Sequence, residues 1–419
     1  MSSTTVNSAA DRPLSERPED LQFGYCTNVH AGTSLEQAQA NLLQYAGAVR
    51  EQLVPQGRLP VGLWLPEPAA VSLIEGNQVA EFGRWLAEHH FLPYTFNGFP
   101  QGDFHQPVVK HAVYEPTWTC DARARYTMCL AEILEALLPA GGCGSISTLP
   151  LGWPYAPWHA ENYYAAADHL LHMAVFLDRL AQQRGCEVVL AIEPEPGCVL
   201  STTEELVEFF EHYLFSSPDH RLARRYLTVC HDMCHSSVMF ESQTQALERY
   251  RQAGIRVGKA QVSSAVHVPW DECVGDSGRQ ASMAEELRAF NEPRFLHQTT
   301  QQSAGGGLQW LVEDLPQALQ QHLSGGEYPP QPWRIHFHVP IFVEQIGQLR
   351  TTASEISAAV QYLQQPASVE GAAWFTGHYE VETYAWSVLP ASASAAAGSE
   401  LANGIARELE HFHKLLCHQ

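Results

Sequence analysis

The sequence predicts an α/β protein folded as a (β/α)8 barrel, and three observations support this fold class. First, short apolar runs alternate with segments whose apolar residues recur at helical spacing. Parallel strands need long crossovers, so this alternation predicts a parallel sheet covered by helices. Second, the sequence up to Val266 contains seven such units. Third, no GxGxxG motif follows the first apolar run. Both favour a closed barrel over an open doubly wound sheet.

The strand-like runs of these seven units are each followed by helix-like sequence, such as 161–183 after the fourth. They begin at Gln22, Val61, Phe91, Gly144, Glu187, Leu227 and Arg256. Two further runs, RIHFHVPIF from Arg334 and HYEVETYAWSVL from His378, raise the count to nine, one more than this barrel holds. Either one run lies outside the barrel or the seventh unit is elaborated. We expect an elaborated seventh unit.

Residues 269–332 interrupt the alternation with charged, Gly-rich and Pro-containing sequence, which predicts an insertion after the seventh strand. Residues 1–20 are polar and contain prolines, as is typical of a disordered leader. We therefore expect residues 21–419 to form one barrel domain with an insertion at about 269–332. The length of 419 residues is within the range that barrels with insertions reach.

Composition narrows the function. The chain has 45% apolar residues, enough for a large core, and 24 basic against 46 acidic residues, a formal charge of −22. That charge disfavours binding to nucleic acid or anionic lipid. Ten cysteines without a CxxC pair are typical of reduced thiols in the cytoplasm. No export signal is visible, and no apolar stretch approaches the ~20 residues of a membrane span. We expect a cytoplasmic protein acting on a small molecule.

Polar residues at the predicted strand ends are the candidates for chemistry, because barrels bind substrate there. Glu193 follows the apolar run VVLAI and precedes Pro194. The alternative interpretation is that Glu193 has only a structural role and binds backbone amides or an arginine. Asp232 ends the run LTVCHD, and His235 follows three residues later, so one turn would bring both to a common ion. Of the two histidines there, His231 is the better candidate for a purely structural role.

Two later runs place ionisable residues two apart, on one face of an extended strand. They are His336 with His338, and His378 with Glu380 and Glu382. Same-face carboxylates repel each other, and a divalent cation removes the repulsion. Carboxylates with imidazoles suit Mn²⁺, Zn²⁺, Mg²⁺ or Co²⁺ and do not distinguish among them. For the histidine pair the alternative is an edge strand that simply exposes both side chains.

The motifs YCTNVHAG, IEPEPG, CHDMCHSSV, HFHVP and EVETYAW, in this order, resemble the xylose-isomerase-like barrels. That superfamily holds sugar phosphate isomerases and epimerases and endonuclease IV. More narrowly, the chain resembles the EboE-type metabolite traffic proteins of the ebo operon from Tyr25 to Pro390. The resemblance implies that Glu193 and Glu382 bind metal and act as the catalytic acid/base pair. It also implies Asp232 as a third ligand and His235 as a contact to substrate or a second metal.

The seventh strand departs from the family pattern. Epimerases place a ligating histidine where Gln261 stands, so either Gln261 or His338 completes the site. We favour His338, because His336 and His338 resemble a ligand pair of endonuclease IV. In addition, Val199 occupies a position where epimerases hold a substrate-contacting glutamate. The predicted substrate-binding residues are His235, His336, Lys259 and His30.

The resemblance implies a metal-dependent isomerase or epimerase of a sugar, cyclitol or related polyol. The ebo operon also encodes cyclase-like and prenyltransferase-like proteins, which implies a small polyol metabolite and makes the other ebo proteins candidate partners. One alternative is a metal-dependent hydrolase of the endonuclease IV type, although the charge of −22 argues against a DNA substrate. The other is a non-catalytic carrier that keeps the barrel and the metal. Gln261 and Val199 are consistent with that carrier.

Overall fold

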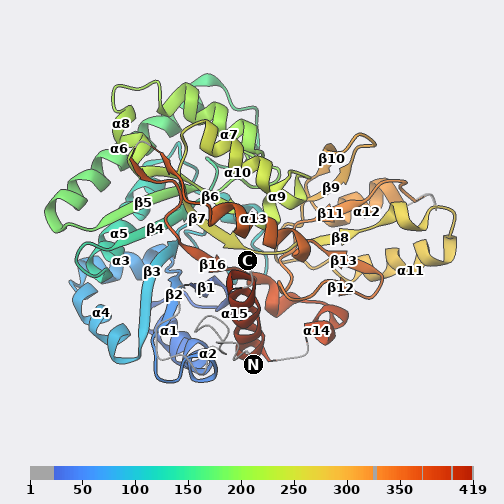
Figure 1. The fold of residues 1–419 in the computed structure, drawn as a ribbon, viewed down its shortest axis with the longest axis horizontal. Helices are drawn as coiled ribbons and strands as arrows, with labels where there is room; N and C mark the ends of the chain where they lie inside the picture. The colour runs from blue at the N-terminus through green and yellow to red at the C-terminus, as the bar shows by residue number, and fades with distance from the viewer. Residues whose placement is uncertain (1–22, 324–327, 370, 398–399, 418–419) are drawn as a thin grey trace, which may run out of the picture.

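Eight parallel strands close into a barrel in the computed structural model of the chain (Figure 1). Around the barrel the order is β1-β16-β7-β6-β5-β4-β3-β2. The strands are β1 (Gly24–Cys26), β2 (Leu59–Leu63), β3 (Phe91–Asn97), β4 (Cys143–Thr148), β5 (Glu187–Ile192), β6 (Leu227–Asp232), β7 (Val257–Val262) and β16 (Tyr379–Val381). The predicted (β/α)8 barrel is thereby confirmed.

The structure describes residues 23–323, 328–369, 371–397 and 400–417. The leader expected at residues 1–20 lies outside these ranges. Within them, the barrel strands are almost entirely buried, which explains why they read as continuous apolar runs. Strands β4 and β5 pair in register over six residues, from Cys143 with Glu187 to Thr148 with Ile192. Their carboxyl ends therefore lie level, and side chains that follow them meet above the barrel.

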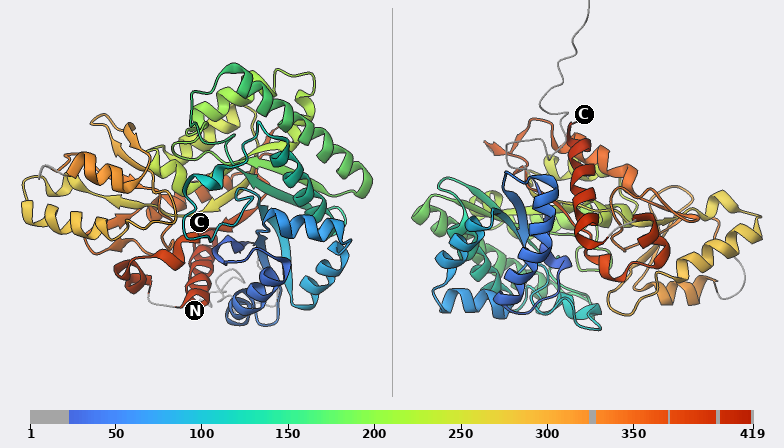
Figure 2. Two further views of the ribbon diagram at one scale, coloured as in Figure 1. Left: turned by 180° about the vertical axis from the view of Figure 1, so that it is seen from behind. Right: turned by 90° about the horizontal axis from the view of Figure 1, so that it is seen from below.

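Helices cover the outside of the barrel between successive strands (Figures 1 and 2). Their ends follow local signals: Thr202 and Glu205 form a capping box on α7, and α6 ends at Gly185 with φ of 79°. None of the described helices is both long and apolar enough to cross a membrane. The helices are α1 (Leu35–Asn41), α2 (Gly47–Leu53), α3 (Glu67–Glu75), α4 (Val79–Glu88), α5 (Asp121–Leu137), α6 (Ala160–Arg184), α7 (Thr203–Phe209), α8 (His220–Tyr226), α9 (Met233–Val238), α10 (Gln243–Gln252), α13 (Ile356–Leu363), α14 (Ala391–Ala397) and α15 (Leu401–Cys417).

A second, antiparallel sheet lies between β7 and β16 in sequence and beside the barrel in space (Figure 1). Its order is β10-β9-β11-β8-β13-β12, and α11 (Ser277–Arg288) and α12 (Leu315–Leu323) accompany it. Its strands are β8 (Val266–Val268), β9 (Thr299–Gln302), β10 (Leu308–Val312), β11 (Trp333–Ile335), β12 (Gln345–Ile346) and β13 (Leu349–Thr351). The predicted insertion after the seventh strand is confirmed.

This sheet also explains the ninth strand-like run. β11, from the run that begins at Arg334, pairs with β8 and β9 outside the barrel, and β16 is the eighth barrel strand. The sheet extends beyond the compositional range 269–332, because β8 precedes this range and β11, β12 and β13 follow it. It has its own core, which includes Trp270 and Trp333. The insertion is thus an elaboration of the seventh unit that carries His336 and His338 to the barrel.

An ion pair lies inside the barrel. Lys259 Nζ is 2.6 Å from Glu380 Oε2, and both side chains are fully buried. Burial opposes the charge of Lys259, but the charge and hydrogen bond of Glu380, together with Cys230 and Cys26, outweigh burial and raise the lysine pKa. A Cβ at Gly62 would lie 1.3 Å from Glu380 Oε1, so only glycine leaves room for this carboxylate. The repulsion expected between Glu380 and Glu382 is therefore relieved at Glu380 by a lysine, which the sequence did not indicate.

Glu408 on α15 ties the end of β16 to the insertion. Its carboxylate accepts hydrogen bonds from Thr383 Oγ1 (2.6 Å), Trp386 Nε1 (2.9 Å) and the Ile341 backbone N–H (3.2 Å). Burial raises the pKa of Glu408 to about 7, and these three donors only partly oppose the rise. Because Thr383 follows Glu382, this contact fixes the backbone of one predicted site residue.

The raised pKa of Glu408 makes a prediction for stability against pH. Because the pKa of Glu408 is higher in the folded than in the unfolded protein, the folded protein favours the neutral carboxyl group. The contribution of Glu408 to the free energy of unfolding is therefore fully present below about pH 4.5 and is lost as pH rises through about 7. We expect the wild-type protein to lose roughly 3 kcal/mol of this stability between pH 5 and 8, relative to Glu408→Gln. Urea unfolding at the two pH values measures the difference. Glu410→Gln on the same helix, at a partly exposed site, should follow the wild type; a Glu408→Gln protein that also does so would contradict the prediction.

Candidate metal centre

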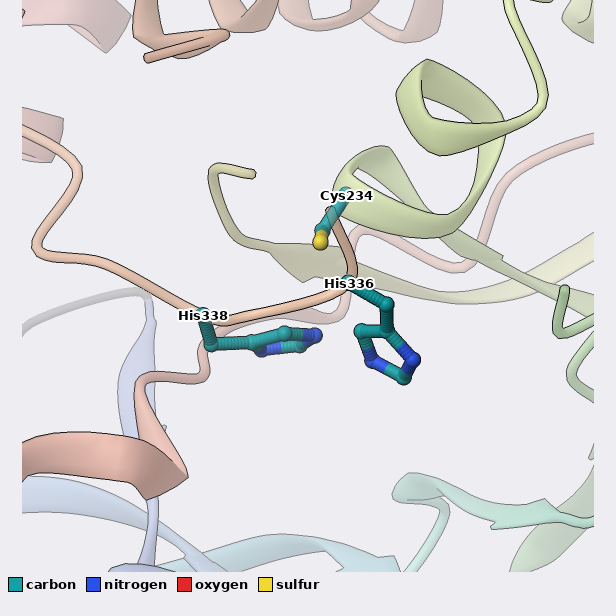
Figure 3. Close-up of side chains that lie close together, drawn as sticks. All are labelled: Cys234, His336 and His338. Carbon is teal, nitrogen blue, oxygen red and sulfur yellow. The ribbon is translucent and has the colours of Figure 1, made fainter. Parts of the chain in front are cut away.

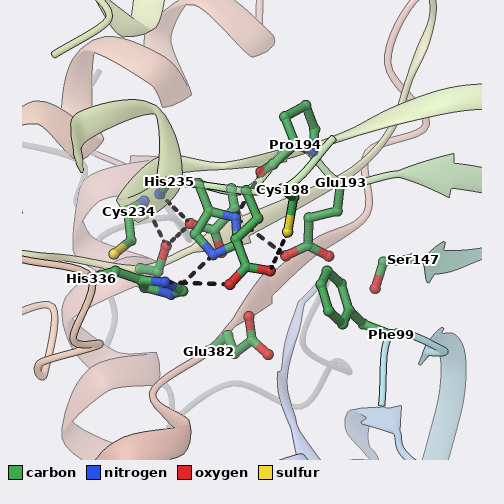
Figure 4. Close-up of polar contacts among 12 residues, drawn as sticks. Phe99, Ser147, Glu193, Pro194, Cys198, Cys234, His235, His336 and Glu382 are labelled. Carbon is green, nitrogen blue, oxygen red and sulfur yellow. Dashed lines mark hydrogen bonds and ion pairs between the residues drawn. The ribbon is translucent and has the colours of Figure 1, made fainter. Parts of the chain in front are cut away.

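Three predicted carboxylates meet at the carboxyl ends of the barrel strands. Figure 4 shows two of them, Glu193 and Glu382. Asp232 is the last residue of β6, while Glu193 and Glu382 directly follow β5 and β16. All three are buried, and one oxygen of each lies within 4.8 Å of the others. Because the parallel strands end at the same level, they bring together Glu193 and Glu382, which are 189 positions apart in the sequence.

Asp232 is held in the ionised form by its local structure. It caps α9: its Oδ1 accepts hydrogen bonds from the His235 backbone N–H (2.9 Å) and from Ser263 Oγ (2.8 Å). Burial by itself would raise the pKa of Asp232, but His235, His338 and these hydrogen bonds outweigh burial and lower it. Its Oδ2 has no hydrogen-bond partner among the described residues. One oxygen is fixed, and the other is available to a ligand.

The pKa values of the two glutamates are shifted upward, in the opposite direction to that of Asp232. Burial, Asp232 and Glu380 raise the pKa of Glu382 to about 8, even though its Oε1 accepts hydrogen bonds from Asn28 (2.7 Å) and Asn97 (2.9 Å). Burial and the charges of Glu382 and Asp232 likewise raise the pKa of Glu193, whose Oε2 has no described partner. A buried cluster of acids with unpartnered oxygens fits a divalent cation, which favours the ionised form of every carboxylate around it.

His338 and His235 add nitrogen ligands to this cluster. His338 Nδ1 bonds to the Glu382 carbonyl oxygen (2.8 Å), and His235 Nδ1 bonds to the Pro194 carbonyl oxygen (2.8 Å). A carbonyl accepts, so both Nδ1 atoms carry the proton and both Nε2 atoms have a free lone pair. His338 Nε2 has no described partner and lies 4.0 Å from Asp232 Oδ2. Burial lowers the pKa of His338 to about 4, which keeps the imidazole neutral, as metal binding requires.

His336 lies beside these two histidines. Figure 3 shows the rings of His336 and His338 projecting from one segment, next to the Cys234 sulfur. Both histidines are buried, which excludes the alternative that an edge strand exposes them. His336 Nε2 faces His235 Nε2 at 3.2 Å (Figure 4), and a shared proton or a cation would stabilise two facing lone pairs. Burial raises the pKa of Cys234 well above its usual value, so it faces the histidines as a thiol.

Gln261 also lies at the level of the cluster. In β7 it pairs in register with Asp232 of β6 and with Glu380 of β16. It is fully buried, and neither atom of its side-chain amide has a described hydrogen-bond partner. The amide oxygen of Gln261 therefore remains an alternative to His338 as the fourth ligand.

Two substitutions separate these alternatives. We expect His338→Ala to weaken binding of Mn²⁺ or Zn²⁺ by roughly a hundredfold or more, because residues that only hydrogen-bond to a metal ligand already change affinity by roughly ten- to a hundredfold. Gln261→Ala should change it by less than roughly tenfold. Titration against a chelating indicator measures both, with circular dichroism as the check on folding. The reverse ranking would assign the ligand to Gln261.

The other predicted residues lie apart from the cluster. Lys259 is in the ion pair inside the barrel, where its Nζ also donates to Phe96 O and Ser147 Oγ at 3.3 Å. His30 bonds to Tyr25 Oη (2.9 Å) and lines a smaller cavity with Trp64 and Phe82. His231, interpreted as structural, bonds to the Gln243 side chain (2.7 Å). Neither Lys259 nor His30 lines the cavity above the carboxylates.

Glu195 is a site residue that the sequence analysis missed. Its Oε1 accepts hydrogen bonds from Tyr114 Oη (2.7 Å) and Gln298 Nε2 (3.2 Å), and it lies 3.4 Å from His336 Nδ1. The repeated Glu-Pro of IEPEPG was an available signal, because side chains two apart in extended backbone share a face. Asn28 and Asn97, which orient Glu382, gave no signal of comparable strength.

A cavity opens above the cluster. Glu193, His235, His336, His338 and Glu382 all contribute to its lining. Fold and site together define a (β/α)8 barrel with a buried, carboxylate- and histidine-rich candidate metal centre beneath a cavity.

No protein-family model matches the chain, and no curated protein matches it either. Solved structures do. A xylose isomerase-like TIM barrel protein from Mycobacterium smegmatis in complex with magnesium has 9% identity and a TM-score of 0.48, with 94% of this chain and 96% of that chain covered. An AP endonuclease, family 2, from Brucella melitensis has 16% identity and a TM-score of 0.36, with 57% and 78% covered. An L-ribulose 3-epimerase has 14% identity and a TM-score of 0.37, with 65% and 79% covered.

Proposed function

We propose that this protein is a metal-dependent isomerase or epimerase of a sugar- or cyclitol-like polyol, acting in the biosynthesis or trafficking of a small metabolite. The observation that carries the proposal is the pair Glu193 and Glu382. Both are buried, both have raised pKa values, both have a carboxylate oxygen within 4.8 Å of one of the ionised Asp232, and both line one cavity. Paired acids with raised pKa values suit proton transfer to and from carbon.

The residues have separate tasks in this proposal. Glu193, Asp232, Glu382 and His338 would hold the cation, with Gln261 as the alternative to His338. When bound, the cation polarises a carbonyl and a hydroxyl oxygen of the substrate. Glu382, oriented by Asn28 and Asn97, and Glu193 hold and move the proton at the reacting carbon. His235 and His336 line the cavity and bind substrate oxygens.

The assignment to the EboE type and other ebo proteins as partners rest on the sequence motifs, and a cytoplasmic location rests on the cysteine usage. All three belong to the same proposal. A carrier that binds the metabolite without turnover would keep the same cavity. The charge of −22 disfavours a hydrolase acting on DNA. A test of turnover therefore distinguishes a carrier from an enzyme.

Hydrogen exchange in D₂O tests the proposed function. Purified protein is incubated with ketoses, aldoses and keto-cyclitols, and deuterium at carbon is measured by mass spectrometry. We expect exchange into at least one of them, its loss after chelation, and its return with Mn²⁺, Zn²⁺, Mg²⁺ or Co²⁺. Loss follows because the proton-transfer carboxylates need the cation for their ionisation and for the acidity of the substrate. Exchange that survives complete metal removal would refute metal dependence, and metal-loaded protein that binds a polyol without exchange would support the carrier.

A further inference from the structure

The cavity above the carboxylates is lined by two chemically different sets of side chains. The polar set consists of Glu193, Glu195, Glu382, His235, His336 and His338 with Asn28 and Asn97. The rest of the lining is mainly apolar. We use the term apolar wall for the set Phe99, Phe104, Val113, Phe295, Leu296 and Tyr384. A sugar or cyclitol alone, which is polar around its whole ring, would leave this wall without a matching surface.

The apolar wall is a fixed part of the structure. The rings of Phe104, Phe295 and Tyr384 contact one another, with centroids 5.0 Å apart for Phe104–Phe295, 5.5 Å for Phe104–Tyr384 and 4.9 Å for Phe295–Tyr384. These rings come from the segment after β3, from the insertion and from the segment after β16. The Arg294 carbonyl accepts hydrogen bonds from the backbone N–H groups of Val109 (2.7 Å) and Lys110 (2.9 Å). These bonds join the segment after β3 to the insertion. The wall is thus formed before a ligand arrives.

The charges around the cavity select against anions. Among the described lining residues, Lys110 is the one Lys or Arg side chain, and it forms an ion pair with Asp314. Glu193, Glu195 and Glu382 also line the cavity. Together with Asp232 they supply more negative charge than one divalent cation neutralises, so a phosphate or carboxylate group would meet net negative charge without a free Lys or Arg among the described lining residues.

We propose that the substrate is an uncharged amphipathic polyol: an oxygen-rich head on the candidate metal centre, joined to an aromatic or cyclic hydrocarbon group that packs on the apolar wall. This inference rests on the proposed function, because it uses the same cavity and names the substrate class. It excludes sugar phosphates and simple free sugars as the preferred ligands. The apolar group supplies binding free energy through buried area, while the head supplies the reacting carbon.

Binding of matched probes tests the substrate class. Methyl, cyclohexyl and phenyl β-D-glucosides share one polar head and differ only in the apolar group, and glucose 6-phosphate adds an anion. Isothermal titration of the full-length, Mn²⁺-loaded protein measures each affinity. We expect the cyclohexyl or phenyl glucoside to bind roughly tenfold or more tightly than the methyl glucoside, and glucose 6-phosphate to bind most weakly. Equal or undetectable binding of all three glucosides, or preference for the phosphate, overturns the proposal.

Two valine variants on one segment locate the effect. Val113 is half-buried and lines the cavity, whereas Val108 is 56% exposed and does not. Val113→Asp should remove the advantage of the phenyl over the methyl glucoside, while Val108→Asp should keep it, and both should bind Mn²⁺ as the wild type does. An advantage that survives Val113→Asp overturns the role of the wall. Binding that depends on the apolar group, without hydrogen exchange, would refute the isomerase and leave the ligand class intact. Hydrogen exchange on simple polyols, without any dependence of binding on the apolar group, would support the isomerase and refute the ligand class.

Discussion

Replacing Glu382 by glutamine should slow hydrogen exchange at carbon by roughly a hundredfold to ten-thousandfold, the usual contribution of a positioned acid or base. Glutamine keeps the size of the side chain and an oxygen that can accept from Asn28 and Asn97, but it cannot take up a proton. The measurement is deuterium incorporation at carbon in D₂O, made at saturating metal so that weaker metal binding does not enter the rate.

Glu241→Gln is the matched control for this experiment. Glu241 is another largely buried acid, its pKa raised to about 7 by burial, and it accepts from Thr203 N (2.9 Å) and Oγ1 (3.0 Å) outside the cavity. We expect Glu241→Gln to exchange at the wild-type rate. If Glu382→Gln at saturating metal also does so, Glu382 is not a proton-transfer group, and the role passes to Glu193 or Glu195.

The second large effect concerns stability. Lys259→Met should lower the free energy of unfolding by roughly 3–5 kcal/mol, because it leaves the Glu380 carboxylate fully buried without its counter-charge. Guanidinium unfolding at pH 7 measures the loss. The double variant Lys259→Met, Glu380→Gln removes both charges and should recover most of it.

Lys414→Met is the control, since Lys414 is 59% exposed and, among the described residues, pairs with Glu410 one turn away. Its effect should stay within roughly 0.5 kcal/mol. A Lys259→Met protein that unfolds like the wild type but binds the glucoside probes poorly would contradict the structural role. It would instead support the substrate-binding role that the sequence analysis assigned to Lys259.

Much of the fold was predictable because burial leaves a periodic trace in a sequence. Barrel strands that are covered on both sides appear in the sequence as apolar runs. The helices between them appear as apolar residues that recur with a period of about 3.6 residues. Strand ends are visible where those runs stop, so the sequence pattern places Glu193 and Asp232 at one end of the barrel, and the family resemblance adds Glu382. Their meeting then follows from parallel strands that end level.

Other features depended on the tertiary structure. The run from Arg334 looked like a barrel strand, and only the second sheet shows that the insertion brings His336 and His338 over the barrel. Lys259 and Glu380 are 121 positions apart, and no pattern indicated that they face each other inside the barrel. The apolar wall likewise joins three distant segments. Periodicity reports whether a residue is buried, whereas the partner it is buried against is fixed by how distant segments pack. The sequence by itself therefore determined the barrel and its carboxylates, and the packing decided their partners and the shape above them.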